Sequence, residues 1–172
     1  AEADVLIVTH AHADHLGKVP KLVKDGFKGV IYSTPATRDL AEPMLADAVK
    51  IMGQEARERG HDPLYSTIDT AQAFSMWKTV DYYTEFTLGD ITVKFLEAGH
   101  ILGSVMVEMR RGGKKMVFSG DVGNTPAPLL RDTDPVVDAD YILTESVYGD
   151  REHEGRNERS AKLAEGLVKA IL

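Results

Sequence analysis

Four side chains that can bind a metal ion fall within six residues of one another: His10, His12, Asp14 and His15. They directly follow the apolar run Val5 to Val8, which is typical of a buried strand. Residues two apart on extended backbone point the same way, so His10 and His12 can bind one ion together. Where the chain turns into the next helix, Asp14 and His15 point elsewhere, towards a second ion. Imidazole and carboxylate ligands without thiolate suit zinc or a similar metal in a catalytic site. Solvated histidines on a surface loop are the less favoured alternative.

Two later segments supply what a site for two metal ions would still need. His100 lies between two predicted strands, in the segment 98–104, whose glycines allow a tight turn. Asp121 follows another apolar strand, in the segment 118–124. A carboxylate there can bridge two cations about 3.5–4 Å apart. Taken alone, His100 is more typical of a structural histidine, and Asp121 could be a turn residue. Their occurrence together with the first cluster favours metal binding for both.

The remaining sequence predicts the elements that must position these side chains. Strands are expected at 5–9, 29–33 and 141–144, and the last is expected to be buried. Helices are expected up to about residue 24, at 35–59, at 66–76 and from about residue 157. Hairpins are expected at 84–97 and 104–119. Helices come first and antiparallel strands follow, an order that predicts a sheet covered by helices on its outer face.

Composition limits the class of protein. The chain has 172 residues, of which 43% are hydrophobic and 27% charged, values typical of one globular domain. No apolar run approaches the roughly 18 residues that span a bilayer. The absence of cysteine excludes disulfides and thiolate metal sites and is compatible with the cytoplasm. A net charge of −7 argues against a general nucleic-acid-coating protein. The missing initial methionine and the uncapped final helix suggest a fragment cut at both ends.

The spacing of these motifs resembles that of a known superfamily. His10-x-His12-x-Asp14-His15, the distant His100 and Ser-Gly-Asp121 are similar to successive metal-binding motifs of the metallo-β-lactamase fold. The segment 144–153, Thr-Glu-Ser-Val-Tyr-Gly-Asp-Arg-x-His, resembles the acidic motif at the start of the β-CASP insertion. That branch includes RNase J and the nuclease of the cleavage and polyadenylation factor.

The resemblance implies a fold and a domain division. The fold class would be α/β (α+β), a partial αββα sandwich with mostly antiparallel or mixed sheets and outer helices. Residues 1–150 would form the catalytic domain, without its N-terminal strands, and residues 151–172 would begin a truncated β-CASP domain.

The resemblance also implies a two-zinc site that hydrolyses RNA by an activated water, leaving a 5′-phosphate and a 3′-hydroxyl. The first zinc would be held by His10, His12 and His100, the second by Asp14 and His15, with Asp121 bridging both. Asp14, Asp121 and Glu145 would be the catalytic residues. Glu145 would not bind metal but would orient a histidine of the β-CASP domain. The alternative interpretation of Glu145 is a carboxylate that lies at the end of a strand and faces water.

Parts of the family pattern are missing from the sequence. An early acidic motif would precede Ala1, and two further histidines, one on the second zinc and one protonating the leaving oxygen, would follow Leu172. The role of His153 is open, and His61 is expected to be solvated. We therefore expect the first metal site to be retained better than the second, and hydrolysis by this chain alone to be weak or absent.

Two alternative functions remain at this stage. The first is another hydrolase of the same fold, a glyoxalase II-like thioesterase or a tRNA 3′-processing nuclease, which is not expected to contain the Glu145 motif. The second is a non-catalytic homologue acting as a binding subunit, although the metal positions that the chain covers are filled. RNA is the expected partner, no membrane contact is expected, and an exposed sheet edge predicts self-association. The sequence does not distinguish endonuclease from exonuclease.

Overall fold

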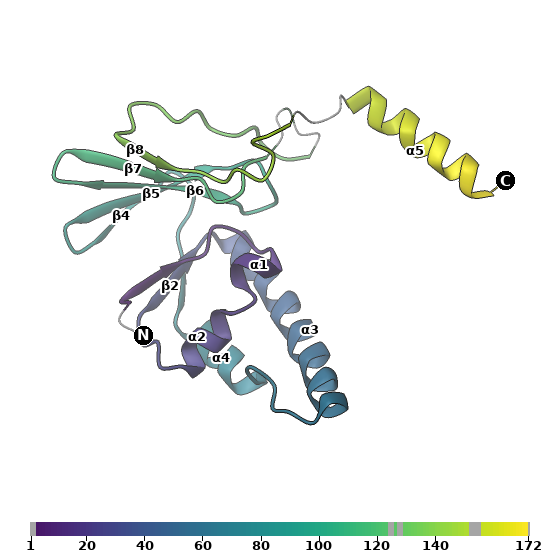
Figure 1. Ribbon diagram of the computed structural model, residues 1–172. Helices are drawn as coiled ribbons and strands as arrows, with labels where there is room; N and C mark the ends of the chain where they lie inside the picture. Colours follow the sequence, from purple (N-terminus) through teal and green to yellow (C-terminus); the bar gives the residue numbers. More distant parts are fainter. Residues whose placement is uncertain (1–2, 124–125, 127–128, 152–155, 172) are drawn as a thin grey trace.

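Two sheets and a layer of helices make up the fold. The structure is a computed structural model that describes residues 3–123, 126, 129–151 and 156–171. A three-stranded sheet lies between four helices on one side and a five-stranded sheet on the other (Figure 1). The expected αββα sandwich is thus present in part. Its described layers are the helices, then the three-stranded sheet, then the five-stranded sheet.

The first sheet is parallel throughout. Its strands, in spatial order, are β1 (Val5–Ile7), β2 (Val30–Ser33) and β3 (Trp77–Thr79). The sequence predicted the first two and missed β3, which is short and directly follows a helix. Parallel neighbours need crossover connections, and the helices supply them.

The helices begin and end close to where the sequence predicts, except that the single short helix expected up to about residue 24 is divided into two. They are α1 (Ala13–Leu16), α2 (Val19–Lys24), α3 (Pro35–Arg59) and α4 (Thr67–Ser75). Thr34 caps α3 by accepting a hydrogen bond from the Thr37 amide, and Gly60 ends that helix in the left-handed conformation. Ser66 and Asp69 form a capping box at the start of α4.

The second sheet is antiparallel except at one edge. Its strands, in spatial order, are β4 (Glu85–Leu88), β5 (Ile91–Glu97), β6 (Val105–Arg111), β7 (Lys114–Phe118) and β8 (Tyr141–Leu143). Strand β8 pairs parallel to β7. The expectation that this strand is buried was wrong: Tyr141, Ile142 and Leu143 are each more than half exposed, because β8 is an edge strand of the described sheet.

Alternating side chains build one core on each side of the first sheet. Ile31 faces the helices and packs with Leu16 and Leu45, whereas its neighbour Tyr32 faces the second sheet. The ring of Tyr32 stacks on Phe86 with centroids 5.0 Å apart. This alternation is the two-residue period of a strand with both faces buried. The two sheets are therefore held face to face, which fixes the ends of their strands relative to one another.

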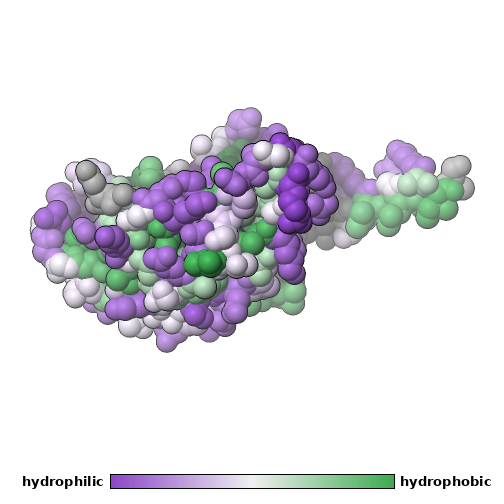
Figure 2. Space-filling model, turned by 90° about the horizontal axis from the view of Figure 1, so that it is seen from below, coloured by the Kyte–Doolittle hydropathy of each residue, from purple (hydrophilic) through white to green (hydrophobic). Residues whose placement is uncertain are grey.

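The final helix lies apart from both sheets. Helix α5 (Arg156–Ile171) extends away from them, and Figure 2 shows apolar residues gathered along one side of the projecting helix. Leu163, Leu167 and Ile171 on this helix are more than half exposed. Within the described residues, no helix is both long enough and apolar enough to cross a membrane.

Candidate metal centre

Three chain segments meet at one end of the two sheets, and each begins where a strand ends. The segment 8–15 follows β1, the segment 98–104 joins β5 to β6, and the segment 119–123 follows β7. They carry the six side chains that the sequence analysis selected as metal ligands. A loop that follows a strand has its backbone fixed by the sheet, while its side chains are free to converge on a shared site.

Backbone hydrogen bonds tie these segments together in pairs. The Val105 amide donates to the Thr9 carbonyl at 2.9 Å, joining the first segment to β6. The Gly123 amide donates to the Ala98 carbonyl at 2.8 Å, joining the third segment to the second. The candidate ligands are therefore carried by segments whose backbones are hydrogen-bonded to one another or to strand β6.

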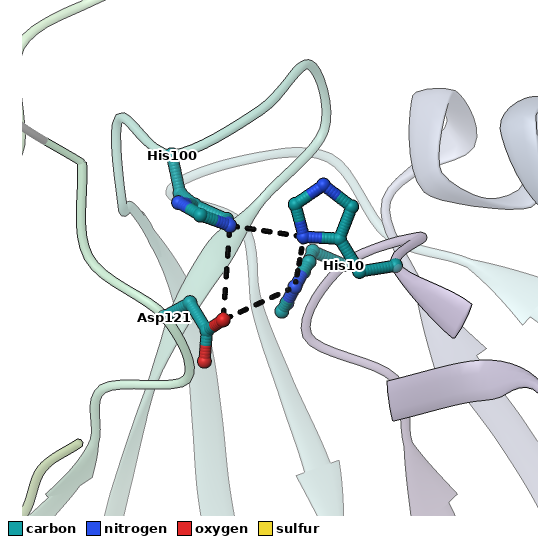
Figure 3. Close-up of side chains that lie close together, drawn as sticks. His10, His100 and Asp121 are labelled. Atoms are coloured by element: carbon teal, nitrogen blue, oxygen red, sulfur yellow. Dashed lines mark hydrogen bonds and ion pairs between the residues drawn. The ribbon is translucent and has the colours of Figure 1, made fainter. Parts of the chain in front are cut away.

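Four donor atoms converge in the first group, which consists of His10, His12, His100 and Asp121. His12 Nδ1 lies 3.1 Å from His10 Nε2 and 3.1 Å from His100 Nε2. Asp121 Oδ2 lies 3.7 Å from His10 Nε2 and 3.7 Å from His100 Nε2. Figure 3 shows His10, His100 and Asp121 pointing towards one another from different segments.

These spacings fit a divalent metal ion. Tetrahedral zinc with ligands at about 2.1 Å places neighbouring ligand atoms about 3.4 Å apart. The separations of 3.1 Å and 3.7 Å in the first group bracket that value. Without a cation between them, the lone pairs of three imidazole nitrogens and one carboxylate oxygen would face and repel one another. The first group therefore suits a divalent metal in both donor chemistry and spacing.

The electrostatic surroundings keep two of these histidines ready to bind a cation. His10 is fully buried, and burial together with the neighbouring His15 lowers its pKa to about 4. Burial, followed by the proximity of His12, also lowers the pKa of His100. Both imidazoles are therefore neutral near pH 7 and offer a lone pair. The other ring nitrogen of His10, Nδ1, lies 3.1 Å from the Thr9 hydroxyl, which holds the ring in its orientation.

A second group shares Asp121 with the first. It consists of Asp14, His15 and Asp121, with donor atoms that lie within 4.8 Å of one another. His15 Nε2 lies 3.2 Å from Asp121 Oδ1 and 3.5 Å from Asp14 Oδ2. Asp121 thus directs Oδ2 to the first group and Oδ1 to the second, the arrangement expected of a bridging carboxylate. With three ligands instead of four, this group is the less complete of the two.

An open pocket of about 400 Å³ adjoins the second group. Its lining includes His15, Asp121, Thr144 and Glu145. The side chain of Asp121 is 23% exposed, whereas that of His10 is fully buried.

The loop that carries His100 is held by residues that the sequence analysis did not select. The hydroxyl oxygen of Ser104 accepts hydrogen bonds from the amides of His100 and Ile101, at 3.1 and 3.2 Å. The buried Glu97 accepts from the Gly99 amide at 2.9 Å. Glu97 is a charged residue at the inner end of an apolar strand, and that position was the available sequence signal.

Glu145 supports the loop that carries Asp121. Its Oε1 accepts a hydrogen bond from the Val122 amide at 2.6 Å, and its own amide donates to the Ser119 hydroxyl at 3.1 Å. The side chain therefore contacts the segment of the metal ligand instead of facing only water. The predicted partner of Glu145, a histidine of another domain, stays a prediction.

Of the two remaining histidines, His61 and His153, the structure describes only His61. His61 is exposed and its ring Nδ1 lies 3.0 Å from the Asp62 carbonyl, as expected of a solvated loop residue. His153 lies outside the described residues.

Replacing Glu145 by alanine is expected to destabilise the protein by about 1.5–3 kcal/mol, the range for a hydrogen bond to a charged group. The Val122 amide would lose its acceptor beside the bridging Asp121. Unfolding in urea measures the loss. Glu165→Ala is the matched control, because Glu165 forms an exposed ion pair with Lys169, and its loss should cost less than about 0.5 kcal/mol. Equal losses in both variants would contradict a supporting role for Glu145.

Comparison with known proteins finds relatives that match nearly the whole chain. Residues 2–155 match the family model described as the metallo-beta-lactamase superfamily. The chain is 35% identical over 170 residues to Ribonuclease TTHA0252 of Thermus thermophilus, covering 99% of this chain and 38% of that protein. It is 30% identical over 172 residues to Endoribonuclease YSH1 of Candida glabrata, covering 98% of this chain and 22% of that protein. The chain thus spans well under half the length of these relatives.

Proposed function

We propose, since the chain belongs to the metallo-beta-lactamase superfamily, that it forms the zinc-binding catalytic part of a ribonuclease of the β-CASP branch. The observation that carries this proposal is the convergence of His10, His12, His100 and Asp121, with Asp121 shared by a second group. The resemblance of Glu145 and its neighbours to the β-CASP motif, and relatives named as ribonucleases, support RNA as the substrate.

The candidate ligands form two groups, and each group would hold one zinc ion. The first zinc would be held by His10, His12, His100 and Asp121, the second by Asp14, His15 and Asp121. When bound, paired zinc ions supply a water acidic enough to attack at neutral pH and offset charge on a phosphate. Asp121 fixes the relation between the sites because its two oxygens face different groups. Glu145 holds the backbone beside Asp121 and so keeps this relation constant.

The scissile phosphate would lie at the His15 and Asp121 side of the pocket beside the second group, since the rest of its lining includes the apolar Ile7, Phe118 and Leu143. A phosphate there would lie next to the shared carboxylate. Two cations would be needed to offset the repulsion between that carboxylate and the substrate, since the chain carries a net charge of −7. Hydrolysis there would leave a 5′-phosphate and a 3′-hydroxyl. The cytoplasmic location and the self-association expected from the sequence stay predictions.

Cleavage of RNA by the full-length protein tests this function. A 5′-labelled single-stranded RNA should be cut by the zinc-loaded protein, and a chelator should abolish the cut. His12→Ala should lower the rate at least 100-fold, since it removes a donor at the centre of the first group. His61→Ala is the matched control and should leave the rate unchanged, because His61 lies on an exposed loop.

The same protein samples separate the other functions. Thioester hydrolysis without RNA cleavage would contradict the proposal in favour of a glyoxalase II-like enzyme. RNA binding without hydrolysis of either substrate, in protein loaded with zinc, would favour a binding subunit. RNA cleavage that survives both chelation and His12→Ala would show that the metal centre is not the site of reaction.

A further inference from the structure

Two buried threonines at the start of α3 meet the loop that carries His100. The hydroxyls of Thr34 and Thr37 both donate hydrogen bonds to the Gly103 carbonyl oxygen, at 2.8 and 2.9 Å. These three residues are buried, and both threonines are at most 1% exposed. A carbonyl oxygen has two lone pairs, so the two hydroxyls satisfy it completely. The contact joins the helix layer to the second sheet across 66 residues of sequence or more.

The Gly103 carbonyl is close to His100 along the backbone. Ser104, the next residue, accepts hydrogen bonds through its hydroxyl oxygen from the amides of His100 and Ile101. The Ser104 amide in turn donates to the Ile101 carbonyl at 3.0 Å. The loop is thus a closed turn, and a displacement of Gly103 would be passed to His100 through bonds that the structure shows.

The start of α3 and the loop at Gly103 pack so closely that a side chain on Gly103 has no space. Gly103 has a φ of +87°, a conformation that favours glycine. A Cβ atom on it would lie 2.6 Å from the Thr37 amide nitrogen and 3.0 Å from Thr34 Oγ1. The backbone of the loop therefore rests directly on the first turn of α3, and the two hydroxyls are its polar attachment points.

We propose that Thr34 and Thr37 are positioning residues, which hold the His100 loop at the distance that metal binding by the first group requires. The proposal rests on the proposed function to the extent that this function places a metal ion at His100. Its physical basis is that a ligand held in place before binding loses less conformational entropy when the ion arrives. The hydroxyls would thus raise metal affinity although neither contacts the ion.

Zinc affinity of Thr37 variants in the full-length protein tests this inference. Thr37→Val keeps the volume and removes the hydroxyl, and Thr37→Ala removes it with less bulk in case valine is not tolerated. Competition with a chromogenic chelator should show about tenfold weaker zinc binding in both, the lower end of the range for residues behind metal ligands. Thr37→Ser keeps the hydroxyl and should bind within about twofold of wild type. In the cobalt form, the visible absorption of the two hydroxyl-free variants should change and that of Thr37→Ser should not.

Thr70→Val is the matched control, because Thr70 is also largely buried in a helix but its hydroxyl bonds to the Ser66 carbonyl within α4. Any loss common to Thr70→Val and Thr37→Val is a loss of stability, which melting of the metal-free proteins measures. Zinc affinity and cobalt spectrum in Thr37→Val equal to those of Thr70→Val would overturn the positioning role. Loss of zinc in His12→Ala in the same series would show that the metal centre itself stands. If His12→Ala bound zinc as wild type does, the proposed function would fail as well.

Discussion

Replacing Asp121 by alanine is expected to weaken zinc binding at the first group about 100-fold and to abolish it at the second. Structural zinc sites contribute about 10–16 kcal/mol, or about 3 kcal/mol for each of four ligands. About 1.4 kcal/mol corresponds to tenfold in affinity, which gives the factor stated. The second group loses more because Asp121 supplies one of its three ligands, beside His15 and the exposed Asp14. Calorimetric titration of the metal-free protein with zinc measures both effects.

Two further variants sharpen this test. Asp121→Asn keeps the shape and one oxygen but loses the negative charge, so it should retain the first ion better than the second. Asp62→Ala removes a carboxylate from an exposed loop and should leave both affinities unchanged. Loss of a single ion in Asp121→Ala, with the other bound as in wild type, would contradict the shared role of this carboxylate.

Replacing Gly123 by alanine is expected to separate two of the segments that build the metal centre. A Cβ atom there would overlap the Gly99 carbonyl and lie 2.8 Å from the His100 amide nitrogen. Because the obstacle is backbone, the loops themselves must move, and the hydrogen bond from the Gly123 amide to Ala98 would be lost. We expect a loss of about 3 kcal/mol or more in unfolding free energy and a clear fall in zinc affinity.

Gly166→Ala is the control for the same change of residue. Gly166 lies in α5 with no atom within 4 Å of its added Cβ, so alanine there should be neutral or stabilise by up to about 1 kcal/mol. Urea unfolding and zinc titration of both variants provide the comparison. Unchanged zinc affinity in Gly123→Ala would show that His100 and Asp121 do not depend on the contact between their loops.

The grouping of the candidate ligands could be predicted because residue types at short spacing indicate it, whereas metal binding by them stays a prediction. His10, His12, Asp14 and His15 follow a strand within six residues of one another, and the structure brings all four together with His100 and Asp121. Most elements were also predictable, since the capping residues Ser66 and Gly60 and the alternation of apolar residues are local signals.

What the sequence did not predict depends on contacts between distant segments. The burial of β8 was mistaken because an apolar strand at a sheet edge has the same sequence as one in the middle. Thr34 and Thr37 lie at the start of the helix predicted at 35–59, and their contact with Gly103 follows from how the layers pack. The domain boundary expected near residue 150 stays a prediction.

Zinc content is the most direct test of the central claim, that this chain assembles a metal centre from His10, His12, His100 and Asp121. Elemental analysis by mass spectrometry should find about one to two zinc ions per chain in the purified protein, and clearly less in His12→Ala. His61→Ala should contain as much zinc as wild type. A folded wild-type protein without zinc, or one whose zinc content is unchanged by His12→Ala, would contradict the claim.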